Sequence, residues 1–344
     1  MNTNKAVKRK RIESLYVLKA ICAFFVIAIH IPSIQQILVP FAGVATPCFL
    51  SITGYLLYSA SHEREMGKCK AWALKSFRLA VMCNIIYAVV YTFVFDIELP
   101  WSDWDFYFKI IFLGIGISGF LWYLTALFEA LLLLYLIIKY CPKLINFLPL
   151  LYIVAFIIRT FEGMPDFDLS GLFFHPTALR NTCILTSLPF LATGYLIHKH
   201  QEKLLKSINL LYAIPITLVS LVAEFYIRKD HALPSSYFML GTYPLVIFLM
   251  LACIRNKDFD IPVLGYIGKK HSPNIYYFHG LFIMFLMKIP LPTCSTYYLV
   301  MGVYLACLPC SFVFNYINEK WHTLVWHPLT DYIRLKILKR KAQY

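Results

Sequence analysis

Charged residues are scarce in this 344-residue chain, where Asp, Glu, Lys and Arg make up 15% and hydrophobic residues 60%. A soluble globular protein usually has about 25% charged residues, and the mean hydropathy here is +0.66. The composition therefore excludes an ordinary soluble domain and indicates a polytopic membrane protein. Because one membrane-spanning helix needs about 20 residues and the helices must be joined by loops, the chain has room for roughly ten helices.

The sequence also lacks the short motifs of common soluble enzymes. It contains no P-loop, no Gly-x-Ser-x-Gly and no His-Glu-x-x-His segment, the signatures of phosphate binding, a serine nucleophile and catalytic zinc. Cys307 and Cys310 form an isolated Cys-x-x-Cys pair, and no histidine pair has further ligands at zinc-site spacing. We therefore predict no metal site.

Apolar stretches predict an all-α bundle of about ten transmembrane helices, forming a single domain over residues 1–344. The predicted spans are 13–32, 40–59, 78–96, 119–139, 143–161, 182–199, 208–228, 237–254, 273–292 and 296–318. A further apolar piece at 110–117 contains two glycines and is too short to cross. We expect it to be interfacial or re-entrant.

Basic residues set the predicted orientation. With both termini in the cytoplasm, 25 of the 32 Lys and Arg residues lie on the inner side, as the positive-inside rule requires. They include a basic N-terminus at 1–12 and a basic tail at 319–344. Anionic lipids of the inner leaflet are sufficient partners for the net charge of +14, so we predict membrane lipids and no nucleic acid as partners.

Two ionisable residues lie in the first predicted span, where burying them in hydrocarbon is costly and marks a functional site. Lys19 and His30 are eleven positions apart, which on a continuous helix places them within about 20° of the same face. An imidazole has an ordinary pKa of about 6.5, so its basic form is abundant at neutral pH. His30 is therefore the first candidate for a general base or, alternatively, a nucleophile.

Other polar residues in predicted spans are further candidates. Glu129 is a carboxylate in the middle of the fourth span, and we expect it to act catalytically or to form a structural ion pair, with Lys19 or His279 as its partner. His279 itself is either a substrate-binding residue or a hydrogen-bonded core histidine.

Hydroxyl-bearing, aromatic and basic residues complete the candidate set. We predict substrate binding for four residues, although helix packing and interface anchoring are the alternatives for them: Ser51, Tyr55, Trp122 and Tyr123. Lys269 and Lys270 either hold the phosphates of a cofactor-like donor or simply follow the positive-inside rule.

Several segments resemble, in order, the acyltransferase 3 family of integral membrane acyltransferases. They are YVLKAICAFFVIAIH at 16–30, FLSITGYLL at 49–57, GFLWYLTALFE at 119–129, FLATGYL at 190–196 and SPNIYYFHGLF at 272–282. In the first segment the family usually has Arg where this chain has Lys19. A Lys offers a point charge in place of a bidentate fork.

The resemblance implies transfer of an acyl group, most often acetyl, from cytoplasmic acyl-CoA to a hydroxyl of an extracytoplasmic glycan or other envelope molecule. Acyl-CoA would be a donor substrate, with no bound cofactor. It implies that Lys19 lies near the donor and His30 near the acceptor, in a bacterial inner membrane. We expect any soluble domain that acceptor modification requires to come from a partner protein of envelope assembly.

Two other functions remain open from the sequence. A transporter or flippase for a polar metabolite or glycan precursor would use the same intramembrane charges as a substrate pathway, and a non-catalytic scaffold of polysaccharide assembly is a weaker alternative. Release of CoA from acyl-CoA would distinguish the enzyme from both.

Overall fold

The computed structural model describes residues 11–31, 38, 40–112, 116–161, 183–230, 239–288, 296–326 and 328. Within these residues the fold is all-helical, as predicted, and contains no strand. The helices are α1 (Glu13–Ala28), α3 (Ala45–Leu57), α4 (His62–Phe93), α5 (Trp104–Phe112), α6 (Trp122–Tyr140), α7 (Leu151–Phe161), α9 (Leu188–Ser207), α10 (Leu210–Asp230), α11 (Thr242–Arg255), α12 (Pro262–Lys270), α13 (Ser272–Met287) and α14 (Thr296–Trp321). Short 3₁₀ segments (Pro142–Asn146 and Leu148–Leu150) precede α7. A π-helical segment (Cys183–Ser187) precedes α9, and another (His322–Trp326) follows α14.

Each predicted span coincides with a helix, and five described helical segments are long and apolar enough to cross a membrane. They are Pro40–Leu57, His62–Phe93, Trp122–Tyr140, Leu210–Asp230 and Tyr298–Leu324. The number of spans and the side of each terminus stay predictions, and residues 1–10 and 329–344 of the two basic ends lie outside the described residues.

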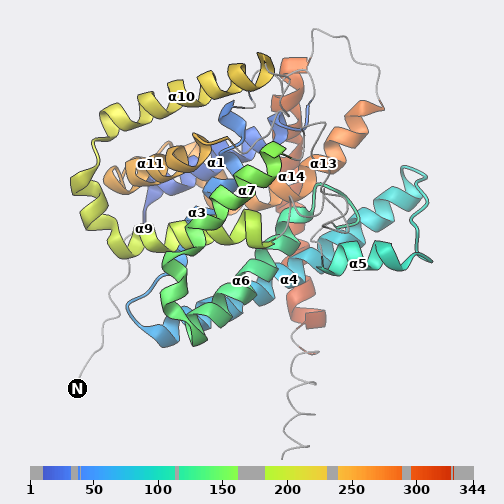
Figure 1. Ribbon diagram of the computed structural model, residues 1–344. Helices are drawn as coiled ribbons and strands as arrows, with labels where there is room; N and C mark the ends of the chain where they lie inside the picture. The colour runs from blue at the N-terminus through green and yellow to red at the C-terminus, as the bar shows by residue number, and fades with distance from the viewer. Residues whose placement is uncertain are drawn as a thin grey trace, which may run out of the picture.

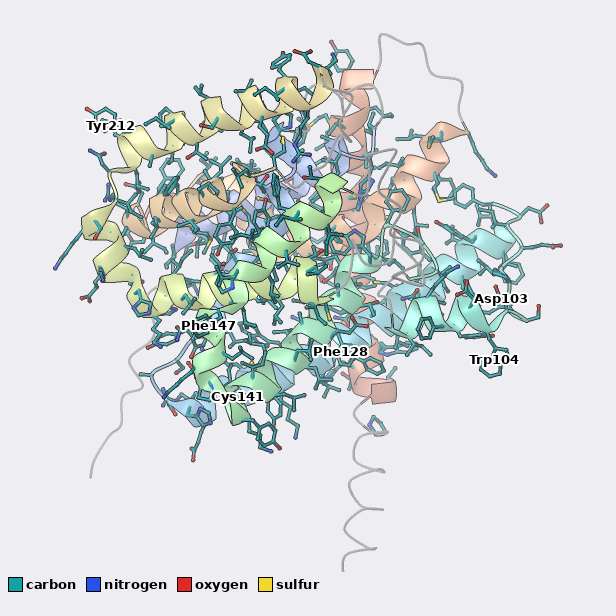
Figure 2. The ribbon with its side chains drawn as sticks, in the orientation of Figure 1. Asp103, Trp104, Phe128, Cys141, Phe147 and Tyr212 are labelled. Atoms are coloured by element: carbon teal, nitrogen blue, oxygen red, sulfur yellow. The ribbon has the colours of Figure 1, made fainter. Side chains whose placement is uncertain are left out.

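The structure corrects the predicted start of the third span. α4 begins at His62, sixteen residues before the predicted span, because its first turns carry charged side chains that hydropathy alone does not recognise as helix. The apolar piece at 110–117, expected to be interfacial or re-entrant, supplies the last residues of α5, which begins at Trp104, and its residues 113–115 lie outside the described residues. Trp104 is 87% exposed and projects away from the bundle beside Asp103 (Figure 2), a position that suits an interfacial anchor.

Polar contacts show which helix ends lie together. The Ser14 hydroxyl donates to the Cys253 carbonyl at 2.7 Å, and the Arg255 guanidinium donates to the Leu205 carbonyl at 2.7 Å. The start of α1 and the ends of α9 and α11 therefore share one end of the bundle, which we call the α9–α10 end. Figure 1 shows the α9–α10 connection at the left and α5 at the opposite side.

The α3–α9 pair is the most extensive helix contact in the bundle, and it depends on two glycines. A methyl group at Gly54 would overlap the Leu191 carbonyl of α9, and one at Gly194 would overlap the Ser51 carbonyl of α3. Small residues let two helix backbones approach closely, which drives helix association in membranes.

Gly54→Ala is therefore expected to force α3 away from α9 and to destabilise the protein by about 1–3 kcal/mol, the usual cost of overpacking. The measurement is the melting temperature and yield of the purified variant. The matched control is Gly67→Ala, because Gly67 lies in α4 with nothing within 4 Å of an added methyl group. Equal melting temperatures for the two variants would contradict this account of the contact.

Candidate active site

Two histidines lie together where α1 ends and α13 passes. The rings of His30 and His279 are 5.1 Å apart between centroids, and the Phe120 ring contacts them at 4.8 and 5.4 Å. Both histidines were candidates from the sequence, but their pairing was not predicted, because they are almost 250 residues apart in the chain.

His30 does not continue the first helix, as the sequence argument had assumed. α1 ends at Ala28, and the His30 amide donates to the Ile27 carbonyl at 3.0 Å in a tighter turn. Pro32 follows shortly, and a proline disfavours helical geometry at the residue before it. The continuous helix assumed between Lys19 and His30 therefore ends two residues before His30, and the shared face stays a prediction. The turn and the neighbouring aromatic rings position His30.

The hydrogen bond of His279 defines which ring nitrogen is available. His279 is fully buried, and its Nδ1 lies 2.6 Å from the Tyr276 carbonyl oxygen. A carbonyl only accepts, so Nδ1 carries the proton and a neutral ring keeps its lone pair on Nε2. Nε2 has no hydrogen-bond partner among the described residues. The pair thus contains an unused basic nitrogen in contact with His30.

A basic cavity of about 420 Å³ lies beside the first half of α1, and the two histidines are not among its lining residues. Lys19, Lys75, Lys269 and Lys270 line it, and no Asp or Glu is among the described residues of its wall. Its volume is typical of small-molecule sites. Several cations without a lining carboxylate make the cavity suitable for an anionic ligand.

Aromatic residues connect the basic cavity to the histidines. Phe49, Tyr123 and Tyr276 all line the cavity, and the two tyrosine rings are 4.7 Å apart. Tyr276 also contacts His279, with 5.6 Å between ring centroids. The predicted site residue Tyr123 is therefore part of the cavity wall. It contacts Tyr276, which in turn contacts His279.

Asparagines that the sequence reading missed form another part of the cavity wall. Asn274 donates to the Ser311 hydroxyl and to the Asn315 side-chain oxygen, both at 2.8 Å. Asn315 and Asn318 line the cavity as well. The signal in the sequence was the spacing of Ser311, Asn315 and Asn318, which places three polar residues on one face of an otherwise apolar helix.

Three predicted substrate-binding residues lie elsewhere. The Ser51 hydroxyl is fully buried and donates to the Phe190 carbonyl at 3.2 Å, so it belongs to the α3–α9 contact. The Tyr55 hydroxyl donates to Gln201 at 2.8 Å in a separate cavity of about 620 Å³. Trp122 packs edge-on against Tyr123 outside the cavity wall.

Glu129 is not beside either of its expected partners. Its carboxyl group lies against the Cys183 thiol at the start of the helical segment before α9. Leu127 and Leu131 line the basic cavity, and Glu129 projects to the other side of α6, because two positions correspond to about 200° of rotation. The expected pairing with Lys19 or His279 is wrong, and a catalytic role for Glu129 remains a prediction.

Comparison with known families places almost the whole helical bundle in one family. A family model described as an acyltransferase domain, Acyl_transf_3, matches residues 12–317. A search of curated proteins and a search of solved structures each found no match. The matched region contains both histidines and every lysine of the basic cavity. The chain therefore belongs to the acyltransferase 3 family and is a membrane acyltransferase.

Proposed function

We propose that this protein transfers an acyl group, specifically acetyl, from cytoplasmic acyl-CoA to a hydroxyl of an extracytoplasmic glycan or other envelope molecule. The observation that carries the proposal is the basic cavity, which is lined by four lysines and joined through Tyr276 to the His30–His279 pair. This geometry places an anion site beside a wall residue, Tyr276, whose ring contacts the histidine pair.

The donor fits the chemistry of the cavity wall. Coenzyme A carries phosphate groups at its nucleotide end and a thioester at the end of an uncharged arm. The lysines bind the phosphates as point charges, and the arm passes between the aromatic side chains Phe49, Tyr123 and Tyr276. The thioester carbonyl then lies toward His279.

The acceptor reaches the pair from the side of His30. His30 is only partly buried, whereas His279 is fully buried. His30 takes the proton from the acceptor hydroxyl as its oxygen bonds to the thioester carbonyl carbon. The protonated His30 ring then turns to donate a hydrogen bond to His279 Nε2, which has no partner among the described residues before the reaction. The carbon–sulfur bond then breaks, and the CoA thiolate leaves and takes up the proton that His30 removed from the acceptor, which returns His30 to its neutral form.

The proposed topology places donor and acceptor on opposite faces of a bacterial inner membrane. Lys19 lies nearer than His30 to the α9–α10 end, where the helices meet the basic segments around Lys203 and Lys257. By the positive-inside rule this end is cytoplasmic. With this end in the cytoplasm, the proposed topology has ten spans and both termini in the cytoplasm.

The experiment is mass spectrometry of ester-linked acyl groups on envelope glycans from cells that lack the protein, with and without a plasmid copy. The proposal expects one O-acetyl ester to disappear in the deletion strain and to return with the plasmid. Purified protein in proteoliposomes should release CoA from acetyl-CoA only when that glycan is present. Identical esters in both strains, under conditions where the protein is made, would refute the proposed acceptor class.

A further inference from the structure

Three polar side chains of α4 lie on the face that meets the surroundings of the histidine pair. Tyr87 and Tyr91 follow Asn84 by three and seven positions, a spacing that places all three on one side of the helix. The buried Tyr87 hydroxyl donates to the Tyr277 carbonyl of α13 at 2.8 Å. Tyr277 is two residues before His279, so this face of α4 contacts the backbone beside the pair.

Asn84 anchors the non-helical segment before α6, residues 116–121. Its Oδ1 accepts a hydrogen bond from the Ile117 amide at 2.7 Å, and its Nδ2 donates to the Ala80 carbonyl at 2.8 Å. A methyl group at Gly116 would lie only 2.9 Å from Asn84 Oδ1, so the backbone of the segment lies directly against this side chain. In a membrane protein, backbone outside a helix needs polar partners within the protein. Asn84 is that partner for the Ile117 amide.

Tyr91 provides a second anchor for the same segment. Its hydroxyl donates to the Ser118 hydroxyl oxygen at 2.7 Å, and Ser118 is buried. The Ser118 oxygens in turn accept from the amides of Phe120 at 3.4 Å and Leu121 at 2.9 Å. Two hydrogen bonds from α4 therefore fix the backbone that carries Phe120.

Phe120 connects this segment to the histidine pair. Its ring is edge-on to both histidine rings, at interplanar angles of 72° to His30 and 85° to His279. A methyl group at Gly280 would overlap the Phe120 ring, so the ring rests on the α13 backbone next to His279. His30 lies in the turn after α1, and among the described residues its side chain is held by the rings of Phe120 and His279.

We propose that Asn84 and Tyr91 are positioning residues, which act through Phe120 to keep the His30 ring beside His279. This inference rests on the proposed function, in which His30 is the base. A catalytic group must be held within about 0.5 Å of its productive position, and a misplacement of about 1 Å can cost about 100-fold in rate. Asn84, Tyr91 and Phe120 do not line the basic cavity, so they should affect turnover and not donor binding.

The test compares Asn84→Leu with Asn84→Asp in proteoliposomes. Leucine removes the acceptor of the Ile117 amide and should lower kcat about 10- to 100-fold, with the KM for acetyl-CoA unchanged. Aspartate keeps an oxygen acceptor at the same position in either ionisation state, so it should retain most of the rate. In a Phe120→Leu background, Asn84→Leu should cause no further loss, because residues that act as a unit are non-additive. Tyr91→Phe, which removes one hydroxyl, should lower kcat in the same way if Asn84→Leu fails to fold.

Asn256→Leu is the matched control. The Asn256 side chain also donates to the carbonyl four residues earlier, at 3.1 Å, but it is exposed at the end of α11, and its variant should keep the wild-type kcat. A second readout does not require acyl transfer. It is the rate at which diethyl pyrocarbonate modifies His30, measured by peptide mass spectrometry relative to the exposed His62. Release of Phe120 should raise this rate several-fold in Asn84→Leu and not in Asn84→Asp.

Four results would each overturn the proposal. They are a wild-type kcat for Asn84→Leu, an unchanged modification rate of His30 in that variant, an equal loss of kcat in Asn84→Asp or Asn256→Leu, and an additive loss in the Phe120→Leu background. Failure of the wild-type protein to release CoA from acetyl-CoA with any glycan would instead refute the proposed function. The modification rates would then still decide whether Asn84 positions His30.

Discussion

His30→Ala is expected to lower the rate of acetyl transfer by about 10²- to 10⁴-fold, the range that a positioned general base contributes. The ring lies against His279 and Phe120 and is the partly buried member of the histidine pair. Removing it leaves the acceptor hydroxyl without a nearby base. The measurement is the turnover rate in proteoliposomes at saturating acetyl-CoA and acceptor.

His279 gives this prediction a sharper form. Residues that act as one unit lose activity non-additively, so the His30→Ala/His279→Ala double variant should be no slower than the slower single variant. His279→Asn keeps a side chain able to donate to the Tyr276 carbonyl but has no basic nitrogen, so it should not rescue the rate. Rescue by Asn would show that His279 acts through packing alone.

His62→Ala is the matched histidine control, because His62 is exposed at the start of α4, away from the pair. Its turnover should equal that of the wild type. Turnover within about threefold of wild type for His30→Ala, far below the factor expected of a general base, would remove His30 from the proposed reaction.

The helices themselves were predictable because burying backbone in lipid demands long apolar segments. The start of α4 was not, since Lys68 and Glu65 make its first turns polar even though their contacts hold them in helix. Lys68 donates to three carbonyls at the end of α3, and Glu65 accepts from the Ser59 amide and the Tyr195 hydroxyl. Hydropathy detects the apolar part of such a helix and not its polar extension.

For the site, residue type was more predictable than residue partnership. Lys19, Lys269 and Lys270 were candidates from charge and spacing, and the structure brings all three to one cavity. In the sequence Lys75 is only one of the 25 basic residues predicted on the inner side, because nothing in the sequence shows which face of α4 meets α6. The predicted pairing of Glu129 with Lys19 or His279 was wrong for the same reason. The sequence does not show that this face of α6 packs against the segment before α9.

Lys19→Met is expected to raise the KM for acetyl-CoA by about 10- to 100-fold, because a hydrogen bond to a charged group contributes about 1.5–3 kcal/mol. Lys19 lies in the basic cavity 6.0 Å above the Phe49 ring, where its charge is held beside Lys75. Methionine retains the length and apolar packing of the side chain. The turnover at saturating donor should fall far less than it does for His30→Ala.

Salt and a conservative variant separate charge from packing in this prediction. If Lys19 binds a phosphate by charge, Lys19→Arg should keep the KM near that of the wild type, and added salt should raise the wild-type KM more than that of Lys19→Met. Lys139→Met is the control, because Lys139 lies at the exposed end of α6 and outside the cavity wall. An unchanged KM for Lys19→Met would remove Lys19 from donor binding and leave only the other lysines of the cavity as candidates for holding the phosphates.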